Sequence, residues 1–461
     1  MIADLKPYPA LKPSGVPWLG EVPEHWDLSP AFGAFVPVKE SNAGMKERQV
    51  LSLSYGRIIV KPEEKLRGLV PASFETYQVV DPGDVIVRTT DLQNDRTSLR
   101  IGQVEDRGII TSAYLALRPL AGLNAKFGSR LLSVWDAGKA IYAYGSGLRQ
   151  SLKFSDFKRM LIPIPPLDEQ EAIVRFLDWV DARIGRAVGL KEREIALLEE
   201  QKQAIITEAV TRGLDKSVAL KPSGVPWLGE VPEHWEVGRV DRCMRSMRES
   251  VEPRAMVGQP VFHFSIPLVQ LTGSGAVEEG GHIDSGKLRI RHRVLLVSRL
   301  NPRKATVTIA EPARGILTVC STEFLQLEAL SCSLGFMEYY FLAASVREEL
   351  SGRVESATKS HQRVSPSDIT KLPSLQPPLE EQEAIVRFLD VETARVDRAG
   401  DRLRREIDLL GEYRTRLISD VVTGKLDVRE AAKGLPEQPE ELDDSEADAG
   451  VQKPLEQAEA A

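Results

Sequence analysis

LKPSGVPWLGEVPEHW, the stretch at Leu11–Trp26, occurs again letter for letter at Leu220–Trp235. The stretch EQEAIVRFLD likewise occurs twice, at Glu169–Asp178 and at Glu381–Asp390. The offsets of 209 and 212 residues divide the 461-residue chain into two halves of nearly equal length. Because a repeat of this kind governs the organisation of a whole chain, we predict the same order in each half. That order is a strap (the first repeated stretch), a divergent segment, the junction PPL(D/E)EQ and a long helix.

The strap holds proline, glycine and tryptophan close together. Proline removes a backbone donor and fixes its own backbone angle, so the strap cannot be a helix or a central strand. We expect an extended segment that is pinned onto a neighbouring surface by Trp18 and Trp26, and by Trp227 and Trp235 in the second copy, because aromatic side chains bury large areas. An aromatic cage for a ligand is the alternative.

Helix signals surround the segment that follows each junction. After Pro165-Pro166 and Pro377-Pro378, acidic residues fill the first turn of each expected helix, where they favour the positive end of the helix dipole, and Gly213 and Gly424 offer stops. Between these signals apolar residues recur at steps of three and four, which is close to a coiled-coil heptad. The predicted helix-pairing residues are Ile173, Leu177, Ile184, Ile195, Leu198, Ile205, Ile385, Leu389, Val396, Leu403, Ile407, Leu410 and Leu417.

Two helices with matching apolar seams have two ways to bury them. They can pack against each other, and closure by a pseudo-two-fold axis then makes them antiparallel, with the divergent domains toward opposite ends. Alternatively each helix packs on its own domain, although the seam is longer than such a domain usually needs to cover. Lys191 and Lys202 interrupt the first seam, and lysine stems can cover apolar surface while the charge stays in water. In the alignment Lys202 falls opposite Arg414.

The divergent segments, Asp27–Pro166 and Glu236–Pro378, are typical of α/β or mostly β domains. DVIVR at Asp84–Arg88 and RVLLV at Arg293–Val297 are strand-like runs. The second segment also carries a basic run, which is either an electrostatic footprint for phosphate or one solvated strand face. The run consists of Lys287, Arg289, Arg291, Arg293, Arg299, Arg303 and Lys304.

Composition and charge bound the class of protein. With 42% hydrophobic and 28% charged residues the chain is typical of globular proteins. The net charge of −7 is a property of residues 434–461, which contribute −8 and so leave +1 for the rest of the chain. We expect that tail, rich in Pro, Glu and Ala, to be disordered. No secretory signal and no stretch of about 20 apolar residues is present, so we expect a cytoplasmic protein.

The repeated motifs make the chain resemble Type I restriction-modification specificity subunits. The strap is similar to the family's domain-opening sequence, and IPIPPLDEQEAIVRFLD at Ile162–Asp178 is similar to its junction between recognition domain and helix. VVTGKLDVRE at Val421–Glu430 is similar to its closing segment, whereas Val210–Lys216 reads VTRGLDK in the first copy. The resemblance covers nearly the whole chain apart from the acidic tail.

The resemblance implies a division of labour between chains. Each divergent domain would read one half of a bipartite site in double-stranded DNA, while the helices set the gap between the halves and dock two modification (methyltransferase) subunits. Methylation and ATP-driven cleavage would belong to the modification and restriction (motor/nuclease) subunits. We therefore expect no catalytic residue, metal or cofactor on this chain, with S-adenosylmethionine, ATP and Mg bound by the partners.

The predicted fold is accordingly α/β (α+β), with two target-recognition domains in pseudo-two-fold arrangement separated by two long antiparallel coiled-coil helices. The expected segments are an N-terminal strap (1–26), recognition domain 1 (27–166), a helix (167–213), the repeated strap (214–235), recognition domain 2 (236–378), a second helix (379–425) and an acidic disordered tail (426–461).

Two places in each recognition domain attract a DNA-binding interpretation: the polar loop after the predicted strand, and the segment just before the junction. Arg and Gln suit guanine and adenine edges, while Ser, Lys and backbone amides suit phosphates. The alternative is that these loops are polar only because they lie at the surface. The candidates are Arg88, Thr90, Gln93, Asn94, Arg96, Ser146, Arg149, Gln150, Lys153, Arg299, Asn301, Arg303, Lys304, Lys359, His361, Gln362 and Arg363.

An enzymatic interpretation finds no motif to support it. The glycine-rich Thr272–Gly281 lacks the lysine of a phosphate-binding loop, and Asn301-Pro302 is followed by arginine rather than by the rest of an amino-methyltransferase motif. Cys243, Cys320 and Cys332 form no CxxC pair, which argues against a disulfide framework and a zinc site. The competing classes are a self-contained methyltransferase or nuclease, which an assay of methyl transfer by the isolated chain would reveal, and a pure scaffold, which sequence-specific DNA binding would exclude.

Overall fold

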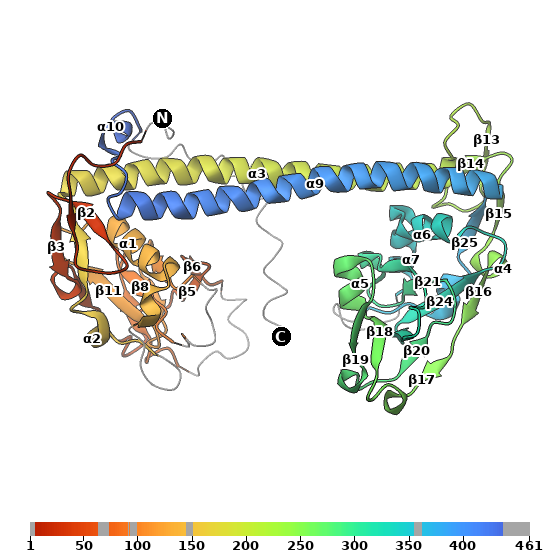
Figure 1. Cartoon of the computed structure of the whole chain (residues 1–461), viewed down its shortest axis with the longest axis horizontal. Coiled ribbons are helices and arrows are strands. Elements are labelled where there is room, and N and C mark those ends of the chain that lie inside the picture. The colour runs from red at the N-terminus through yellow and green to blue at the C-terminus, as the bar shows by residue number, and fades with distance from the viewer. Residues whose placement is uncertain are drawn as a thin grey trace. The chain divides into compact units, whose positions relative to one another are not determined.

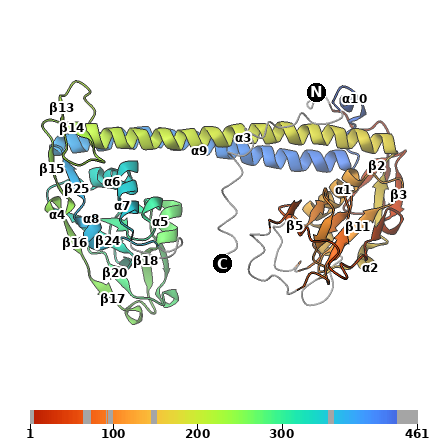
Figure 2. The same cartoon turned by 180° about the vertical axis from the view of Figure 1, so that it is seen from behind.

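The computed structural model describes residues 5–62, 73–90, 92, 99–143, 151–354 and 362–436. The chain divides into two compact units. Unit 1 is Met1–Lys191 with Arg405–Ala461, and unit 2 is Glu192–Arg404. Two long helices, α3 (Leu167–Arg212) and α9 (Leu379–Val422), each contribute a stretch to both units. Both views in Figures 1 and 2 show them side by side.

Recognition domain 1 belongs to unit 1 and is opened and closed by one antiparallel pair of strands, β3 with β12. Its largest sheet has the order β4-β11-β8-β9, and α1 packs against β8 and β9. The elements of unit 1 besides the long helices are β1 (Leu11–Pro13), β2 (Glu21–Pro23), β3 (Asp27–Pro30), β4 (Phe35–Pro37), β5 (Leu51–Ser54), β6 (Arg57–Val60), β7 (Gln78–Val80), β8 (Val85–Val87), β9 (Ile101–Gln103), β10 (Gly108–Ile110), β11 (Leu115–Pro119), α1 (Ala125–Ala137), α2 (Phe154–Phe157), β12 (Leu161–Ile164) and α10 (Arg429–Ala432).

Recognition domain 2 belongs to unit 2 and repeats this plan. β15 pairs with β25, one sheet has the order β16-β24-β21-β22, and α6 packs against β21 and β22. A second sheet has the order β17-β20-β23-β18-β19, in which β18 and β23 are parallel. The elements are β13 (Leu220–Pro222), β14 (Glu230–Pro232), β15 (Glu236–Arg239), α4 (Val240–Cys243), β16 (Met244–Met247), β17 (Ser250–Val251), β18 (Pro260–Phe264), α5 (Ile266–Thr272), β19 (Ala276–Glu279), β20 (Lys287–Arg289), β21 (Val294–Ser298), β22 (Val307–Ala310), β23 (Leu317–Ser321), β24 (Phe324–Ala329), α6 (Leu334–Leu342), α7 (Ala344–Gly352), α8 (Pro366–Thr370) and β25 (Pro373–Gln376).

The two recognition domains share one fold although their sequences diverge. The starts of β7 and β20, of β8 and β21, and of α1 and α6 are each 209 residues apart. From α2 and α8 onward the starts are 212 residues apart, as they are for β12 and β25 and for α3 and α9. The change of offset therefore lies between α1 and α2 in domain 1 and between α6 and α8 in domain 2. The strand-like runs quoted from the sequence form β8 and β21.

Each strap is held by the glutamate that begins the repeated helix motif. Trp26 is fully buried, and its Nε1 donates to Glu169 Oε1 at 2.9 Å, while His25 Nε2 lies 2.8 Å from Glu169 Oε2. The second copy repeats these contacts: Trp235 Nε1 donates to Glu381 Oε2 at 3.1 Å, and His234 Nε2 lies 2.8 Å from the same oxygen. The tryptophans are thus packing anchors, as the sequence predicted, and each strap is a short antiparallel hairpin.

The glutamine that follows this glutamate holds the recognition domain. Gln170 Nε2 donates to Pro165 O at 2.8 Å and to Gly122 O at 2.9 Å, and its Oε1 accepts from Asn124 N at 2.7 Å. Gln382 makes the matching contacts with Pro377 O and Ser333 N, both at 2.8 Å. The repeated EQ dipeptide therefore joins strap, domain and helix in each unit.

The long helices are antiparallel within each unit. In unit 1, Arg414 Nε lies 2.7 Å from Asp181 Oδ1, and Lys191 pairs with Glu406. Residue numbers therefore increase along α3 in the direction in which they decrease along α9. In unit 2, Lys202 Nζ lies 2.6 Å from Asp397 Oδ1. The lysines that interrupt the apolar seam therefore bind acids of the facing helix. Lys202 and Arg414, which the alignment placed opposite each other, each bind an acid of the facing helix, but the two acids are not at aligned positions.

The helices also pack on their own domains, so the two arrangements weighed from the sequence occur together. Phe176 and Leu177 of α3 share a buried cluster with Trp135 of α1 and with Leu417 and Val421 of α9. In unit 2, Leu389 of α9 shares a cluster with α6 and with the end of α3. Of the predicted helix-pairing residues, the buried ones are Ile173, Leu177, Ile184, Ile385, Leu389, Val396, Leu403 and Leu417, and the half-buried ones are Ile195, Leu198, Ile205, Ile407 and Leu410.

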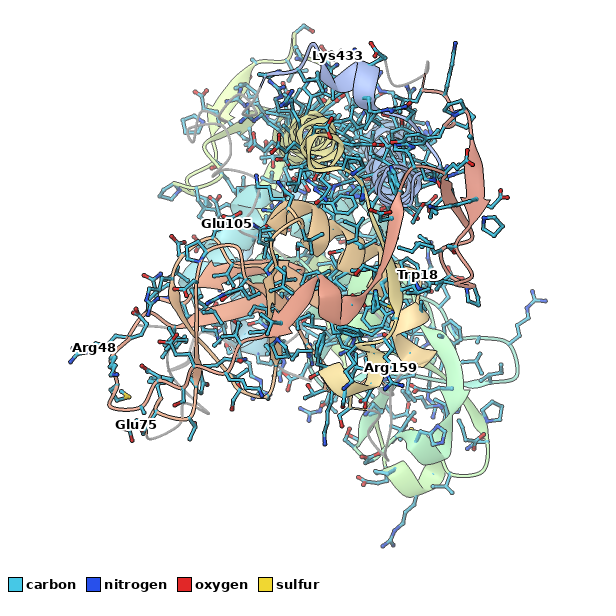
Figure 3. The ribbon with its side chains drawn as sticks, turned by 90° about the vertical axis from the view of Figure 1, so that its left-hand side faces the viewer. Trp18, Arg48, Glu75, Glu105, Arg159 and Lys433 are labelled. Atoms are coloured by element: carbon cyan, nitrogen blue, oxygen red, sulfur yellow. The ribbon has the colours of Figure 1, made fainter. Side chains whose placement is uncertain are left out.

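The predicted boundary of the disordered tail at residue 426 is wrong. Val428, Ala432 and Leu435 are buried in the core of unit 1, and α10 lies between the first and last of them. Arg429 also lies over the ring of Tyr8, 5.1 Å from its centroid. Figure 3 shows this part of unit 1, with Lys433 marking the end of α10 and Trp18 marking the strap. Residues 437–461 lie outside the described residues.

Candidate nucleic-acid interface

The two places that the sequence named separately in each domain lie next to each other in the structure. In domain 1, Leu152 N of the pre-junction segment donates to Thr89 O of the post-strand loop at 2.9 Å. In domain 2, Val364 N donates to Arg299 O at 3.0 Å. The two equivalent bonds define one polar surface in each domain, made by the end of β8 or β21 and by the segment before α2 or α8. We call this surface the loop pair.

The loop pair of domain 2 has an unusual backbone. Asn301 N donates to Gln362 O at 2.7 Å, and Asn301 Oδ1 accepts from Gln362 N at 3.3 Å. Asn301 has a φ of 50° and Ala305 has a φ of 43°. Both values lie in the left-handed region, which residues other than glycine rarely adopt. Between them, Pro302–Lys304 form one 3-10 turn that leaves the side chains of Arg303 and Lys304 exposed. Strain of this kind clusters at functional sites.

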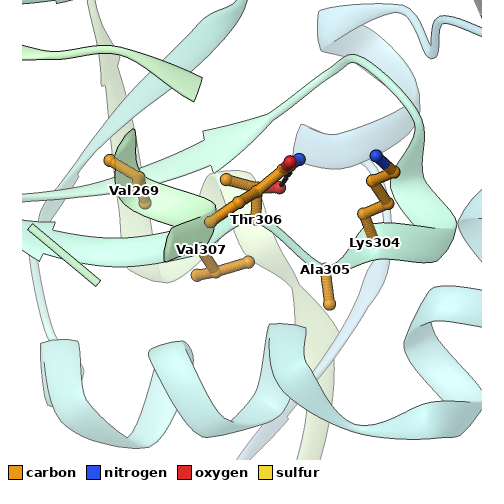
Figure 4. Close-up of a pocket in the computed structure, with 6 residues that line it drawn as sticks. Val269, Lys304, Ala305, Thr306 and Val307 are labelled. Carbon is orange, nitrogen blue, oxygen red and sulfur yellow. Dashed lines mark hydrogen bonds between the residues drawn. The ribbon is translucent and has the colours of Figure 1, made fainter. Parts of the chain in front are cut away.

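A cavity of about 320 Å³ lies beside this turn and is shown in Figure 4. Gln270 Nε2 donates to Thr306 Oγ1 at 2.8 Å within it. Lys304 and Ala305 of the loop pair contribute to its wall, and the other lining residues are Val269, Gln270, Thr306 and Val307. The cavity therefore belongs to the same polar surface as the loop pair.

Two arginines of the loop pair converge on one carboxylate. Arg363 Nε and Nη2 donate to Glu323 at 3.1 and 2.8 Å, and Arg299 Nη2 lies 3.4 Å from Glu323 Oε2. Glu323 also orders the backbone, because its carbonyl accepts from Arg299 N at 2.9 Å. With Arg303 and Lys304 exposed nearby in the chain, this group carries an excess of positive charge, which suits phosphate.

The basic run that precedes this loop is not a single phosphate footprint. Lys287 is buried, its Nζ lies 2.6 Å from Ser285 Oγ, and burial lowers its pKa. Arg291 Nη2 donates to Glu249 at 2.6 Å, and Arg293 Nε lies 2.9 Å from Glu311. Lys287 and Arg289 lie on β20, whereas Arg291 and Arg293 lie between β20 and β21, so the first part of the run is not one solvated strand face either. Within the basic run, only the residues from Arg299 onward remain candidates for binding phosphate.

In domain 1, the post-strand loop is shaped by Arg100, which is fully buried. Its Nη1 donates to Thr90 O at 2.8 Å and to Arg88 O at 3.2 Å, and its own backbone N donates to Asp136 Oδ2 at 2.8 Å. Lys153 is the N-cap residue of α2, and its N donates to Asp156 Oδ2 at 2.8 Å. The candidates that lie outside the described residues are Gln93, Asn94, Arg96, Ser146, Arg149, Gln150, Lys359 and His361.

Sequence reasoning missed Arg100 and Glu323, which organise the loops without being part of them. Neither carries a local signal, since the partners of each are brought together only by the sheet.

Within the described residues no group of three or more His, Cys, Asp or Glu could hold a metal ion. All three cysteines are free, and Cys332 Sγ donates to Cys243 O at 3.3 Å. None of the described helices is long and apolar enough to cross a membrane.

Comparisons with known proteins agree with this architecture. Residues 114–195 match the family described as Type I restriction modification DNA specificity domain. The type I restriction enzyme MjaX and MjaVIII specificity subunits of Methanocaldococcus jannaschii are 32% and 33% identical to this chain over 89 and 81 residues. These matches cover 19% and 18% of this chain and 19% and 17% of the relatives, so the match spans about a fifth of the length of either curated relative.

One solved structure describes the complex assembly and conformational transition of the type I R-M system. Its alignment with this protein covers 88% of this chain and 99% of the solved chain. It has a TM-score of 0.63 at 16% identity, which is a likeness of fold. The predicted mixed α/β fold with two long helices is thereby confirmed. The resemblance to Type I specificity subunits is confirmed as well, by the family match and by the two curated relatives together.

Proposed function

We propose that this chain, which carries a Type I restriction modification DNA specificity domain at residues 114–195, is the DNA sequence-specificity subunit of a Type I restriction-modification complex. Each recognition domain reads one half of a bipartite site in double-stranded DNA. The bases are contacted by the loop pair, and the long helices set the gap between the two halves.

The observation that carries this proposal is the duplication of the loop pair on one fold. Equivalent backbone hydrogen bonds, Leu152 to Thr89 and Val364 to Arg299, build the same surface in each unit, whereas the side chains on it differ between the units. A protein that reads two different half-sites needs this combination of a constant scaffold and variable side chains. In such a surface the phosphate contacts position the protein and the base contacts specify the sequence.

The chemistry would reside in partner chains. We propose two modification subunits docked on the helical region, with restriction subunits joining them. S-adenosylmethionine, ATP and Mg would bind to those partners. This chain would supply the sequence-specific binding of DNA and the scaffold for the partners, and no catalytic group.

The experiment that tests the proposal exchanges one recognition domain. Residues 27–166 are replaced by the first recognition domain of another Type I specificity subunit, joined at the β3 and β12 ends, and methylated motifs are sequenced in cells that supply the modification and restriction subunits. We expect one half-site to change and the other to be retained. Change in both half-sites, or in neither, would contradict the assignment of one domain to one half-site.

Controls separate the competing classes of function. The purified chain alone, given S-adenosylmethionine and duplex DNA, should transfer no methyl group, whereas a self-contained methyltransferase would. The chain assembled with its modification subunit should bind one motif far more tightly than random duplex, and a pure scaffold would not.

A further inference from the structure

Glu323 occupies an unexpected position for an acid on a surface that contacts DNA. It lies at the turn between β23 and β24, its side chain is 21% exposed, and Ser321 Oγ accepts a hydrogen bond from its N at 3.3 Å. Its carboxylate meets Arg299 from the end of β21 and Arg363 from the segment before α8. Three segments that are far apart in sequence thus meet at one carboxylate.

The geometry of Arg363 leaves part of its guanidinium available. Its Nε and one N–H of Nη2 are directed to the two oxygens of Glu323, at 3.1 and 2.8 Å. A guanidinium has five N–H donors in a planar fork, so this pairing leaves the edge formed by Nη1 and the other N–H of Nη2. The side chain is 54% exposed, and that edge has the spacing for the two acceptors of guanine, O6 and N7.

The carboxylate restricts an otherwise flexible side chain. A free arginine at the surface samples many rotamers and loses that freedom when it binds a base. The side-on pairing with Glu323 already fixes the plane of the Arg363 guanidinium, and Arg363 is anchored by its backbone bridge to Leu300. Arg299, at 25% exposure, is more enclosed and is the second guanidinium at this single carboxylate, so the three side chains together carry a net positive charge.

We propose that Arg363 reads a guanine in the half-site of recognition domain 2 and that Glu323 is the positioning residue that holds Arg363 in the reading orientation. This inference rests on the proposed function and names one residue and one base of it. Glu323 itself touches no DNA. It acts through Arg363, so its removal affects the same base pair as removal of Arg363 and no other.

The test compares base preference at every position of the site. The full chain is assembled with its modification subunit, the wild-type complex selects its motif from a pool of duplexes with random bases, and single-base variants of that motif are then competed against it. Arg363→Ala should lower discrimination at one G·C pair of one half-site by about tenfold to a hundredfold. Glu323→Gln should lower it at the same pair, by about tenfold or less, and the double variant should lose no more than Arg363→Ala because the two residues act as one unit.

Matched variants distinguish positioning from a purely structural role. Glu328→Gln removes a similar carboxylate on β24, which accepts from Arg245 Nε at 3.1 Å, and should leave every base preference unchanged. Arg363→Lys keeps the charge but lacks the fork, so affinity for random duplex should persist while the guanine preference is lost. If Glu323→Gln does not fold, Arg363→Lys still tests whether Arg363 reads a guanine.

Two results would overturn the inference: unchanged base preference in Arg363→Lys or Glu323→Gln, or an effect of Glu323→Gln at a base pair different from that of Arg363→Ala. A wild-type complex that selects no motif would instead contradict the proposed function. The two failures are therefore distinguishable.

Discussion

Gly424 ends α9 at the point where the helix meets the first strap. Its φ of 77° is left-handed, and a Cβ there would clash with Pro23 Cδ and lie 3.0 Å from Trp26 Cη2. Gly213 ends α3 in the same way, beside Glu381 and Trp235. The two helix stops found in the sequence are therefore also the contact points at which each helix reaches a strap.

We predict that Gly424→Ala destabilises the chain. The left-handed conformation costs a residue with a Cβ about 1 to 2 kcal/mol, and the clash with Pro23 adds to this cost. Gly411→Ala is the matched control, because Gly411 lies within α9 and a Cβ there would meet nothing within 4 Å. It should be neutral or stabilise by up to about 1 kcal/mol. Urea unfolding of both variants checks this, and equal effects would contradict the assigned role of Gly424.

Glu338 of α6 offers a test by pH. Its Oε1 accepts from Ile309 N at 3.1 Å, and burial raises the pKa of this carboxyl. Below the ordinary glutamate pKa of about 4.3 the group is protonated in both folded and unfolded chains. As pH rises, the unfolded chain ionises more readily, so the free energy of unfolding falls. Glu338 therefore costs stability at neutral pH.

We expect Glu338→Gln to raise the unfolding temperature at pH 7 to 8 and to leave it unchanged near pH 4, since the amide oxygen still accepts from Ile309 N. Glu348→Gln, an exposed carboxyl on α7, should show no such pH-dependent gain. Scanning calorimetry at both pH values measures the difference. A gain that persists at pH 4 would show that burial of the charge is not its cause.

At the scale of single residues, the sequence identified the members of the loop pair but not their supports. Arg299 and Arg363 were candidates because basic residues in polar loops are visible in sequence. Glu323, which joins them, is 24 residues from Arg299 and 40 from Arg363, and only the pairing of β21 with β24 brings it there. Contacts of this kind depend on strand register, which no single motif in this chain encodes.

At the scale of elements, the ion pairs between α3 and α9 explain the lysines in the apolar seam. Lys202 Nζ lies 2.6 Å from Asp397 Oδ1, with 22% and 47% of the side chains exposed. We predict that a double-mutant cycle of Lys202→Ala and Asp397→Ala yields a coupling of about 0.2 to 1 kcal/mol, which decreases at high salt. The largely exposed pair Lys216–Glu208 should show none. Zero coupling for Lys202 would mean that only the aliphatic part of its side chain contributes to stability.

The elements that the sequence predicted well are those with a long period or a duplicate. The helices were predicted because apolar steps of three and four persist over their whole length, and their order was predicted because both copies retain the EQ motif. Most strands of the recognition domains were not predicted, since many have only three or four residues, too few to show a period. Val428, Ala432 and Leu435 show the converse error, because the predicted tail began directly after the second helix, at residue 426, although its acidic composition begins only at residue 434.

At the scale of the whole molecule, both long helices pass from one compact unit to the other, α3 between Lys191 and Glu192 and α9 between Arg404 and Arg405. Residues added at these two positions leave the contacts within each unit intact. The end of α3 is a poorer place for an insertion, because Ala209 and Val210 are buried in the core of unit 2 together with Trp235.

We predict that four residues inserted at both positions lengthen the gap between the half-sites without changing either half-site. Four residues add about 6 Å to a helix and exceed one turn of 3.6 residues, which rotates the rest of the helix by roughly 40°. On DNA with one base pair per about 3.4 Å, that displacement corresponds to one or two further base pairs in the gap. Insertion into α3 alone should abolish activity, because the ion pairs between the helices can no longer all form. Sequencing the methylated motif of the double insertion measures the gap, and a fully active variant with an unchanged gap would show that the helices do not set it.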